Sequence, residues 1–83
     1  MNVLALIEAG AQQLTDAGVA FGHGTTNAFD EAAWLVLWKL GLPLDDLDGV
    51  AGHPVAAAQV QAVNELLAQR IATRKPAAYL THE

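Results

Sequence analysis

Three stretches of this chain repeat apolar residues at the three- and four-residue spacing of an α-helix, and Gly and Pro residues interrupt the chain between them. This spacing predicts helices over residues 3–17, 27–40 and 55–74. No stretch alternates apolar and polar residues, so we expect no strand. With 83 residues, the chain holds one domain at most. The prediction is an all-α fold, a small helical bundle of three main helices with a possible extra short helical turn.

The first predicted helix has signals at both ends. Asn2 is the expected N-cap, because its side-chain oxygen can accept from the free N–H groups of the first turn. Gly18 is placed to end the helix in the left-handed conformation. Gly10 lies on the apolar face, where its lack of a side chain predicts the close approach of a second helix.

The second predicted helix carries apolar residues on two sides. Asp30 and Glu31 fall in its first turn, where negative charge suits the helix dipole, and Gly41 ends it. Trp34 and Trp38 lie with Glu31 on one side of the helical wheel. The opposite apolar face consists of Phe29, Ala32, Ala33, Val36 and Leu40. A helix of this kind is normally the central one of a bundle.

A connector with an expected helical turn at residues 44–47 leads to the third predicted helix. Pro76 ends this helix, because a proline disfavours helical geometry in the preceding residue. Val55 and Ala56 stand where a Ser or Thr cap would be expected at its start. The predicted inner face holds Val60, Val63, Leu67 and Ile71, and the predicted outer face holds Glu65, Gln69 and Thr73.

Composition argues against several kinds of catalytic site. The chain has no Cys and no Ser, so thiolate metal sites and the usual hydrolase nucleophiles are not expected. His23, His53 and His82 are isolated from one another, which argues against a metal site. No Gly-rich loop follows a predicted strand, so a cradle for a nucleotide or for S-adenosylmethionine is not expected.

Charge narrows the class of partner. The formal net charge is −5 with four Lys and Arg residues. This balance argues against direct binding of nucleic acid, because phosphates need clustered basic groups, and it is compatible with a basic protein partner. The apolar N-terminal run has no basic flank and is soon broken by Glu8. Neither a signal peptide nor a membrane span is therefore predicted, and we expect a cytoplasmic protein.

Six residues are candidate contacts with a substrate or with another domain: His23, Trp34, Trp38, Arg70, Arg74 and Tyr79. The loop at residues 22–25 puts His23 beside a helix N-terminus, which suits an acidic or carbonyl-bearing ligand. Alternatively, the glycines of this loop only form the turn that precedes the helix cap. Both interpretations stay open.

The aromatic and basic candidates also have two interpretations each. Trp34 and Trp38 either form a docking surface or are covered as ordinary core, and an exposed indole would favour self-association of the chain. Arg70, Arg74 and Lys75 are the only basic cluster. They either stabilise the C-terminal end of the third helix or meet, together with Tyr79, another domain or the substrate.

Two short motifs carry a resemblance to a known family. Residues 22–25 read Gly-His-Gly-Thr, residues 30–32 read Asp-Glu-Ala, and residues 74–81 read Arg-Lys-Pro-Ala-Ala-Tyr-Leu-Thr. With them the chain resembles the N-terminal helical domain of the protein-glutamine N5-methyltransferases, in the branch that modifies bacterial ribosomal protein L three. The positions that match the family's Arg-x-Pro-x-x-Tyr-Leu signature are Arg74, Pro76, Tyr79 and Leu80.

The resemblance implies a domain that recognises and positions ribosomal protein L three for transfer of a methyl group from S-adenosylmethionine to a glutamine amide. In the family, this chemistry depends on a downstream catalytic domain with an Asn-Pro-Pro-Tyr motif. Pro43, Pro54 and Pro76 are never adjacent, so the motif is absent, and we expect this chain to bind no cofactor and to be inactive alone. Residues 1–75 would form the recognition domain, and residues 76–83 would begin the linker to the catalytic domain.

Two alternative functions stay open. The chain could be a stand-alone helical module for protein interaction or dimerisation, with no enzyme attached. It could also be the same domain of a release-factor glutamine methyltransferase, a branch that shares the Pro-x-x-Tyr signature but lacks the Gly-His-Gly-Thr loop.

Overall fold

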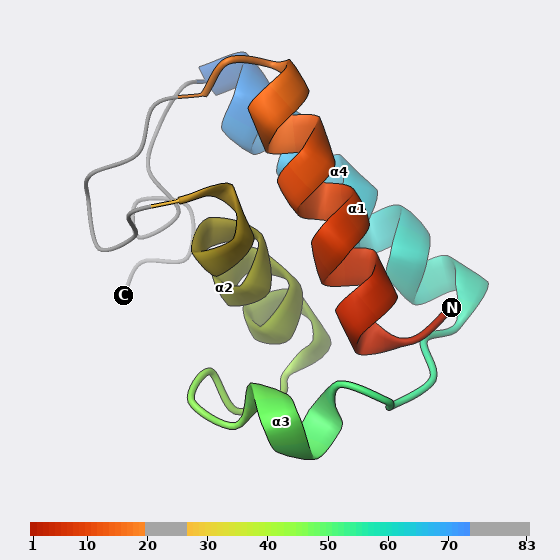
Figure 1. Cartoon of the computed structure of the whole chain (residues 1–83). Coiled ribbons are helices and arrows are strands. Elements are labelled where there is room, and N and C mark those ends of the chain that lie inside the picture. Colours follow the sequence, from red (N-terminus) through yellow and green to blue (C-terminus); the bar gives the residue numbers. More distant parts are fainter. Residues whose placement is uncertain (20–26, 74–83) are drawn as a thin grey trace.

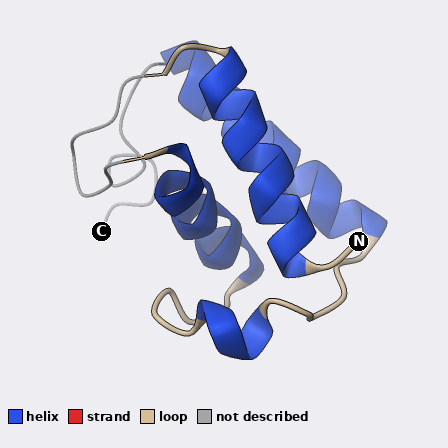
Figure 2. Ribbon diagram, in the orientation of Figure 1, coloured by secondary structure: helices blue, strands red, loops and turns tan. Residues whose placement is uncertain are grey.

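The computed structural model describes residues 1–19 and 27–73. In these two ranges the chain forms four helices, in the order α1 (Val3–Asp16), α2 (Ala28–Leu40), α3 (Leu47–Val50) and α4 (Ala57–Thr73). Figure 2 shows these helices joined by loops, with no strand among the described residues. The all-α fold expected from the sequence is confirmed.

The three long helices pack against one another around a hydrophobic core. Figure 1 shows α1 lying against α4 with α2 beside them, while the single turn of α3 lies across one end of the bundle. Each fully buried large apolar side chain contributes about 1.5–3 kcal/mol to folding. The buried apolar residues are Val3, Leu6, Ile7, Leu14, Val19, Ala32, Leu35, Val36, Leu37, Val63, Leu66 and Leu67.

α1 approaches both other long helices at Gly10. A Cβ atom at this position would lie 3.2 Å from Cδ1 of Leu67 on α4 and 3.4 Å from Cβ of Ala32 on α2. The side chain of Leu67 is completely buried, so it has little room to move aside. The close approach predicted at Gly10 is confirmed, and it involves two helices.

The ends of α1 and α2 follow the signals in the sequence. The side-chain oxygens of Asn2 and Asn27 each accept a hydrogen bond from a backbone N–H of the first turn, both at 2.8 Å. Gly18 and Gly41 follow the two helices with φ angles of 68° and 72°. This left-handed conformation is one that glycine adopts without a steric cost. The expected cap at Asn2 and the expected helix ends at Gly18 and Gly41 are confirmed, and the structure assigns the cap of α2 to Asn27.

The start of α4 is capped from inside the helix. Gln59 Oε1, in the first turn, accepts a hydrogen bond from the backbone N–H of Ala56 at 2.9 Å. This contact is one half of a capping box. It supplies the cap that neither Val55 nor Ala56 can offer from its own side chain.

The first turn of α1 is tied to the segment between α3 and α4. Val3 and Leu4 donate backbone hydrogen bonds to two carbonyl oxygens of this segment, at 3.0 and 2.9 Å, and Val55 donates back to Met1 at 2.9 Å. The two acceptors are the carbonyl oxygens of His53 and Ala51. N–H groups that a helix leaves free in its first turn therefore find acceptors far along the chain.

The expected position of the short helical turn was wrong. The turn expected at residues 44–47 lies three residues further along, as α3. Leu47 and Val50 both pack against the core. Because residues three apart share one side of a helix, a turn between these two directs both side chains inward.

The predicted apolar face of α2 is confirmed in part. Ala32 and Val36 are buried, whereas Phe29 is 37% exposed, and Glu31, which we expected on the side of the two Trp residues, is 1% exposed. The reason is that α4 covers the side of α2 that carries Glu31. Glu31, Ala32, Leu35 and Val36 are buried, and we call these four residues the inner face of α2.

The faces of α4 agree in part with the expectation. Val63 and Leu67 are buried as predicted, whereas Val60 and Ile71 are half-buried. The buried set also includes Leu66 and Arg70. The outer residues Glu65, Gln69 and Thr73 are exposed, as expected.

Candidate functional site

A buried ion pair joins α2 to α4. Arg70 Nε donates to Glu31 Oε2 at 2.7 Å, and Arg70 Nη2 donates to Glu31 Oε1 at 3.4 Å. The side chains of Arg70 and Glu31 are 3% and 2% exposed. The planar fork of a guanidinium group matches the two oxygens of a carboxylate, which makes this one of the stronger ways to hold a charge inside a core.

The ion pair bears on one predicted contact residue. Arg70 is a candidate contact with a substrate or another domain, but the structure buries its guanidinium group against Glu31. In this arrangement it presents almost no surface to a partner. The structure gives no support to a direct contact between Arg70 and a partner, and this contact stays a prediction.

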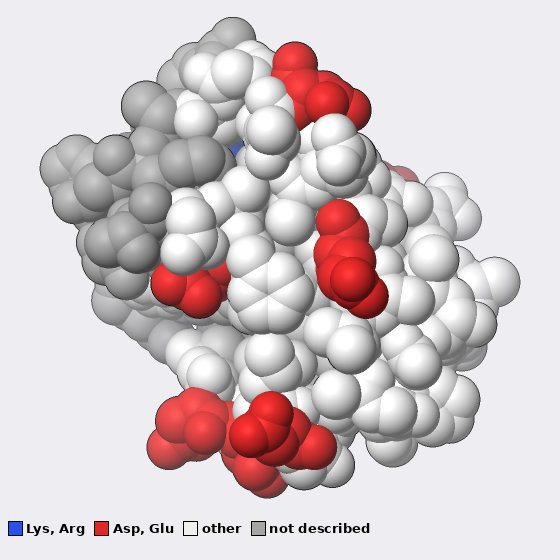
Figure 3. All heavy atoms as spheres, in the orientation of Figure 1, with Lys and Arg blue, Asp and Glu red and all other residues white. Residues whose placement is uncertain are grey.

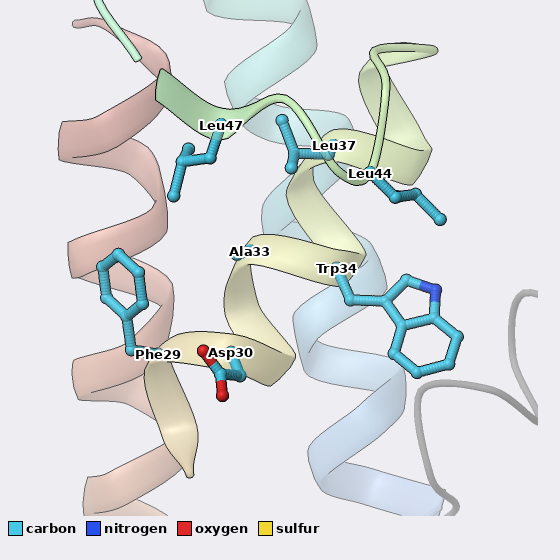
Figure 4. Close-up of a pocket in the computed structure, with 7 residues that line it drawn as sticks. All are labelled: Phe29, Asp30, Ala33, Trp34, Leu37, Leu44 and Leu47. Atoms are coloured by element: carbon cyan, nitrogen blue, oxygen red, sulfur yellow. The ribbon is translucent and has the colours of Figure 1, made fainter. Parts of the chain in front are cut away.

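The opposite side of α2 forms an open apolar groove with the connector that follows the helix. Its volume is about 430 Å³, and it is lined by Phe29, Asp30, Ala33, Trp34, Leu37, Leu44 and Leu47. We call it the α2 groove. In Figure 4, Phe29 and Leu47 lie on one side of the small Ala33, while Trp34 and Leu44 lie on the other. Because Ala33 ends at a methyl group, it leaves room between the larger side chains.

The side chains at the edges of the α2 groove are more exposed than a core allows. Leu44 is 43% exposed and Phe29 is 37% exposed. Leu37, by contrast, is buried at 1%. The groove therefore joins solvent to the hydrophobic core, a property of surfaces that bind other molecules.

Trp34 and Trp38 are both half-buried and pack against the core. Trp34 also lines the α2 groove. Its indole nitrogen is buried and has no hydrogen-bond partner in the described parts of the chain. A buried donor left unpaired costs about 1–3 kcal/mol. Trp34 is thus both core and groove wall, so neither of the two interpretations of the Trp pair excludes the other.

Acidic side chains border the α2 groove. Asp30 lines it directly, and a second, smaller hollow beside it is lined by Leu44, Asp45, Asp46, Leu47 and Asp48. Figure 3 shows a group of acidic atoms over α3 and the loop that precedes it. The groove is therefore apolar at its centre and negative at its edge.

The remaining candidate contacts lie outside the described residues. These are His23 in the Gly-His-Gly-Thr loop, and Arg74 and Tyr79 in the C-terminal motif. Their roles stay predictions. The same holds for the linker predicted at residues 76–83.

Some residues of the site were not predicted from the sequence. Leu44 and Leu47 belong to the connector, and their contact with α2 depends on the path of the chain between two helices. One signal could have indicated the groove. Phe29 and Ala33 are four residues apart and so share one side of α2.

The described residues include neither a cluster suited to a metal ion nor a helix suited to span a membrane. Across residues 1–19 and 27–73, no group of three His, Asp or Glu side chains is close enough to hold a metal ion. None of the four described helices has the length and apolar character that a membrane span requires.

Comparison with known proteins identifies curated relatives of this chain. The chain is 44% identical over 78 residues to "Ribosomal protein uL3 glutamine methyltransferase" of Burkholderia pseudomallei, which covers 94% of this chain and 25% of that protein. It is 40% identical over 82 residues to the protein of the same name in Xanthomonas campestris, covering 99% of this chain and 27% of the relative. No protein-family model and no solved structure matches.

The similarity covers nearly all of this chain but only about a quarter of the length of the curated relatives it matches. It confirms the resemblance inferred from the motifs. The chain corresponds to the N-terminal domain of ribosomal protein uL3 glutamine methyltransferases, where uL3 is the protein called L three above.

Proposed function

We propose that this chain is the substrate-recognition and positioning domain of an enzyme that methylates a glutamine side chain of ribosomal protein uL3. The relatives named above carry this activity in their names. The observation that carries the proposal is their identity of 40–44% across almost the whole of this chain. A substrate of this kind would place the protein in the cytoplasm.

The physical properties of the domain support a binding role. The α2 groove is open and apolar at its centre, and the net charge of −5 favours a basic partner. An amide nitrogen is a poor nucleophile, so the reaction needs accurate orientation of the glutamine. A separate domain can supply binding energy from regions remote from the reacting amide, and this energy holds the glutamine in place.

The cofactor of the proposed enzyme would be S-adenosylmethionine, and the described residues do not fit it. They form helices without a strand, whereas a dinucleotide-type cradle needs a strand, a Gly-rich loop and a helix. We therefore propose that cofactor binding and methyl transfer belong to the larger part of the enzyme that this chain does not match. This chain would then take no part in the chemical step.

The direct test uses the full-length protein and two substrates, uL3 and a bacterial release factor. Mass spectrometry after incubation with S-adenosylmethionine should show methylation of a glutamine in uL3. Methylation of the release factor alone would contradict the proposal and favour the release-factor branch.

A second test concerns the division of labour between the two parts. Calorimetry with the 83-residue chain should detect no binding of S-adenosylmethionine, and binding in the micromolar range would contradict that expectation. The gene sequence separates the proposal from a stand-alone module, because only the proposal requires a downstream Gly-rich loop and an Asn-Pro-Pro-Tyr motif in the same reading frame.

A further inference from the structure

We propose that the α2 groove binds a segment of the protein substrate in which an apolar side chain is flanked by Lys or Arg. This inference rests on the proposed function and names the surface that would carry it out. Two properties of the groove support it: an apolar centre with room, and an acidic edge.

The centre of the groove fits an apolar side chain. Phe29 and Trp34 flank Ala33, and the connector adds Leu47 on the side of Phe29 and Leu44 on the side of Trp34 (Figure 4). The volume of about 430 Å³ exceeds that of a single side chain, so a short segment could enter. Burial of Leu44 and Phe29, which are now partly exposed, would favour its binding.

The edge of the groove favours positive charge. Asp30, Asp45, Asp46 and Asp48 lie along it. Of the Lys and Arg residues that the structure describes, Arg70 is buried against Glu31. The other is Lys39, nine positions after Asp30, which at 100° per residue puts it on the opposite side of α2. The described part of the groove therefore has acidic groups without basic neighbours, and a basic segment complements it.

Trp34, which lines the groove, carries a hydrogen-bond donor that is buried. The indole N–H of Trp34 has no acceptor among the residues the structure describes. Because this nitrogen is buried, a backbone carbonyl of a bound peptide would reach it only if the indole turned. A protein segment with an apolar side chain between Lys or Arg residues matches both the apolar centre and the acidic edge, and this match favours a peptide as the occupant.

The test is an NMR titration of the ¹⁵N-labelled 83-residue chain with purified uL3 and, separately, with a synthetic peptide that alternates Lys and Leu. We expect uL3 to shift the backbone amide signals of residues 29–37 and 44–48. Higher ionic strength should weaken this binding, because the edge contacts are exposed to solvent.

Two matched double variants separate the groove from overall charge. Asp45→Lys with Asp48→Lys replaces two negative charges at the edge of the groove with positive ones. Glu8→Lys with Glu65→Lys makes the same change in net charge at two exposed positions on α1 and α4. We expect the groove variant to bind uL3 about tenfold more weakly, because two attractions become repulsions. The control should change the affinity less than about twofold. Leu44→Gln, which alters no charge, should also weaken binding.

The outcomes distinguish this inference from the proposed function. Binding of uL3 with shifts outside the groove, or with equal losses in both double variants, overturns the inference and leaves the proposed function standing. Binding of the Lys-Leu peptide in the groove without binding of uL3 supports the groove chemistry and contradicts the proposed function. Failure of both ligands to bind overturns both. The amide spectra themselves report whether each variant is folded.

Discussion

The two faces of α2 differ in whether their buried polar atoms have hydrogen-bond partners among the described residues. On the inner face, the charged Glu31 is buried but held by Arg70. Around the α2 groove, the indole N–H of Trp34 is buried with no partner among the described residues, while large apolar side chains such as Leu44 and Phe29 are partly exposed. On the inner face, the charged group is paired within the chain. Around the groove, a buried donor is unpaired and apolar side chains are exposed, which are properties of a surface that binds a partner.

The largest effect is expected from breaking the ion pair of the inner face. Arg70→Met leaves the Glu31 carboxylate buried without its guanidinium partner, which costs about 3–5 kcal/mol of unfolding free energy. Glu31→Leu combined with Arg70→Met should recover most of this loss, because the two apolar side chains can pack together. Urea denaturation measures both.

Gln69→Met, an exposed change on the same helix, serves as the control for the ion pair and should alter stability by less than about 0.5 kcal/mol. If Arg70→Met were as mild as this control, the pair would contribute little, and the contrast between the two faces would lose its main support.

The next prediction compares the stability lost when a leucine on the inner face or at the edge of the groove is replaced by alanine. Leu35→Ala, on the inner face, should cost about 2–5 kcal/mol, since Leu35 is completely buried. Leu44→Ala, at the edge of the groove, should cost less than about 1 kcal/mol, because 43% of Leu44 is exposed already. Thermal unfolding of both variants tests the comparison. Equal losses would show that the edge of the groove is part of the core.

A smaller effect is expected where α1 approaches the inner face. Gly10→Ala adds a methyl group 3.2 Å from the buried Leu67. The overlap costs about 1–3 kcal/mol, and the better helix propensity of Ala returns about 1 kcal/mol. A net loss of about 1 kcal/mol should appear in urea denaturation. Gly52→Ala, where nothing lies within 4 Å, should be neutral or slightly stabilising. A gain at Gly10 would mean that Leu67 can move aside.

The smallest effect is expected at the wall of the groove. Trp34→Phe removes the unpaired indole N–H, which offsets most of the loss of buried apolar volume, so stability should change by less than about 1 kcal/mol. Trp38→Phe is the control. It removes no buried unpaired donor of this kind and should lose about 1 kcal/mol or more. A larger loss at Trp34 than at Trp38 would contradict the contrast between the faces.

The sequence predicts local features of this fold well. The cap at Asn2 and the glycines that end helices at positions 18 and 41 depend on a few neighbouring residues, and all of them are found. Gly10 was predictable for a related reason, because a glycine on an apolar face has few purposes other than close packing. These features need no knowledge of how distant segments meet.

The sequence predicts the pairing of distant residues poorly. The Glu31–Arg70 pair joins residues 39 positions apart, and a helical wheel places a Glu outside by its chemical type. Only the position of α4 shows that this side of α2 is inside. The groove was missed for the same reason, because Leu44 and Leu47 join it through the path of the connector.

The backbone bonds between the first turn of α1 and the segment before α4 bear on how the chain folds during synthesis. Val3 and Leu4 are made first, yet their acceptors, the carbonyls of residues 53 and 51, are made much later. The first helix can form early with help from Asn2, but its first turn is completed only after the segment before α4 has left the ribosome. The beginning of this chain therefore reaches its final state late.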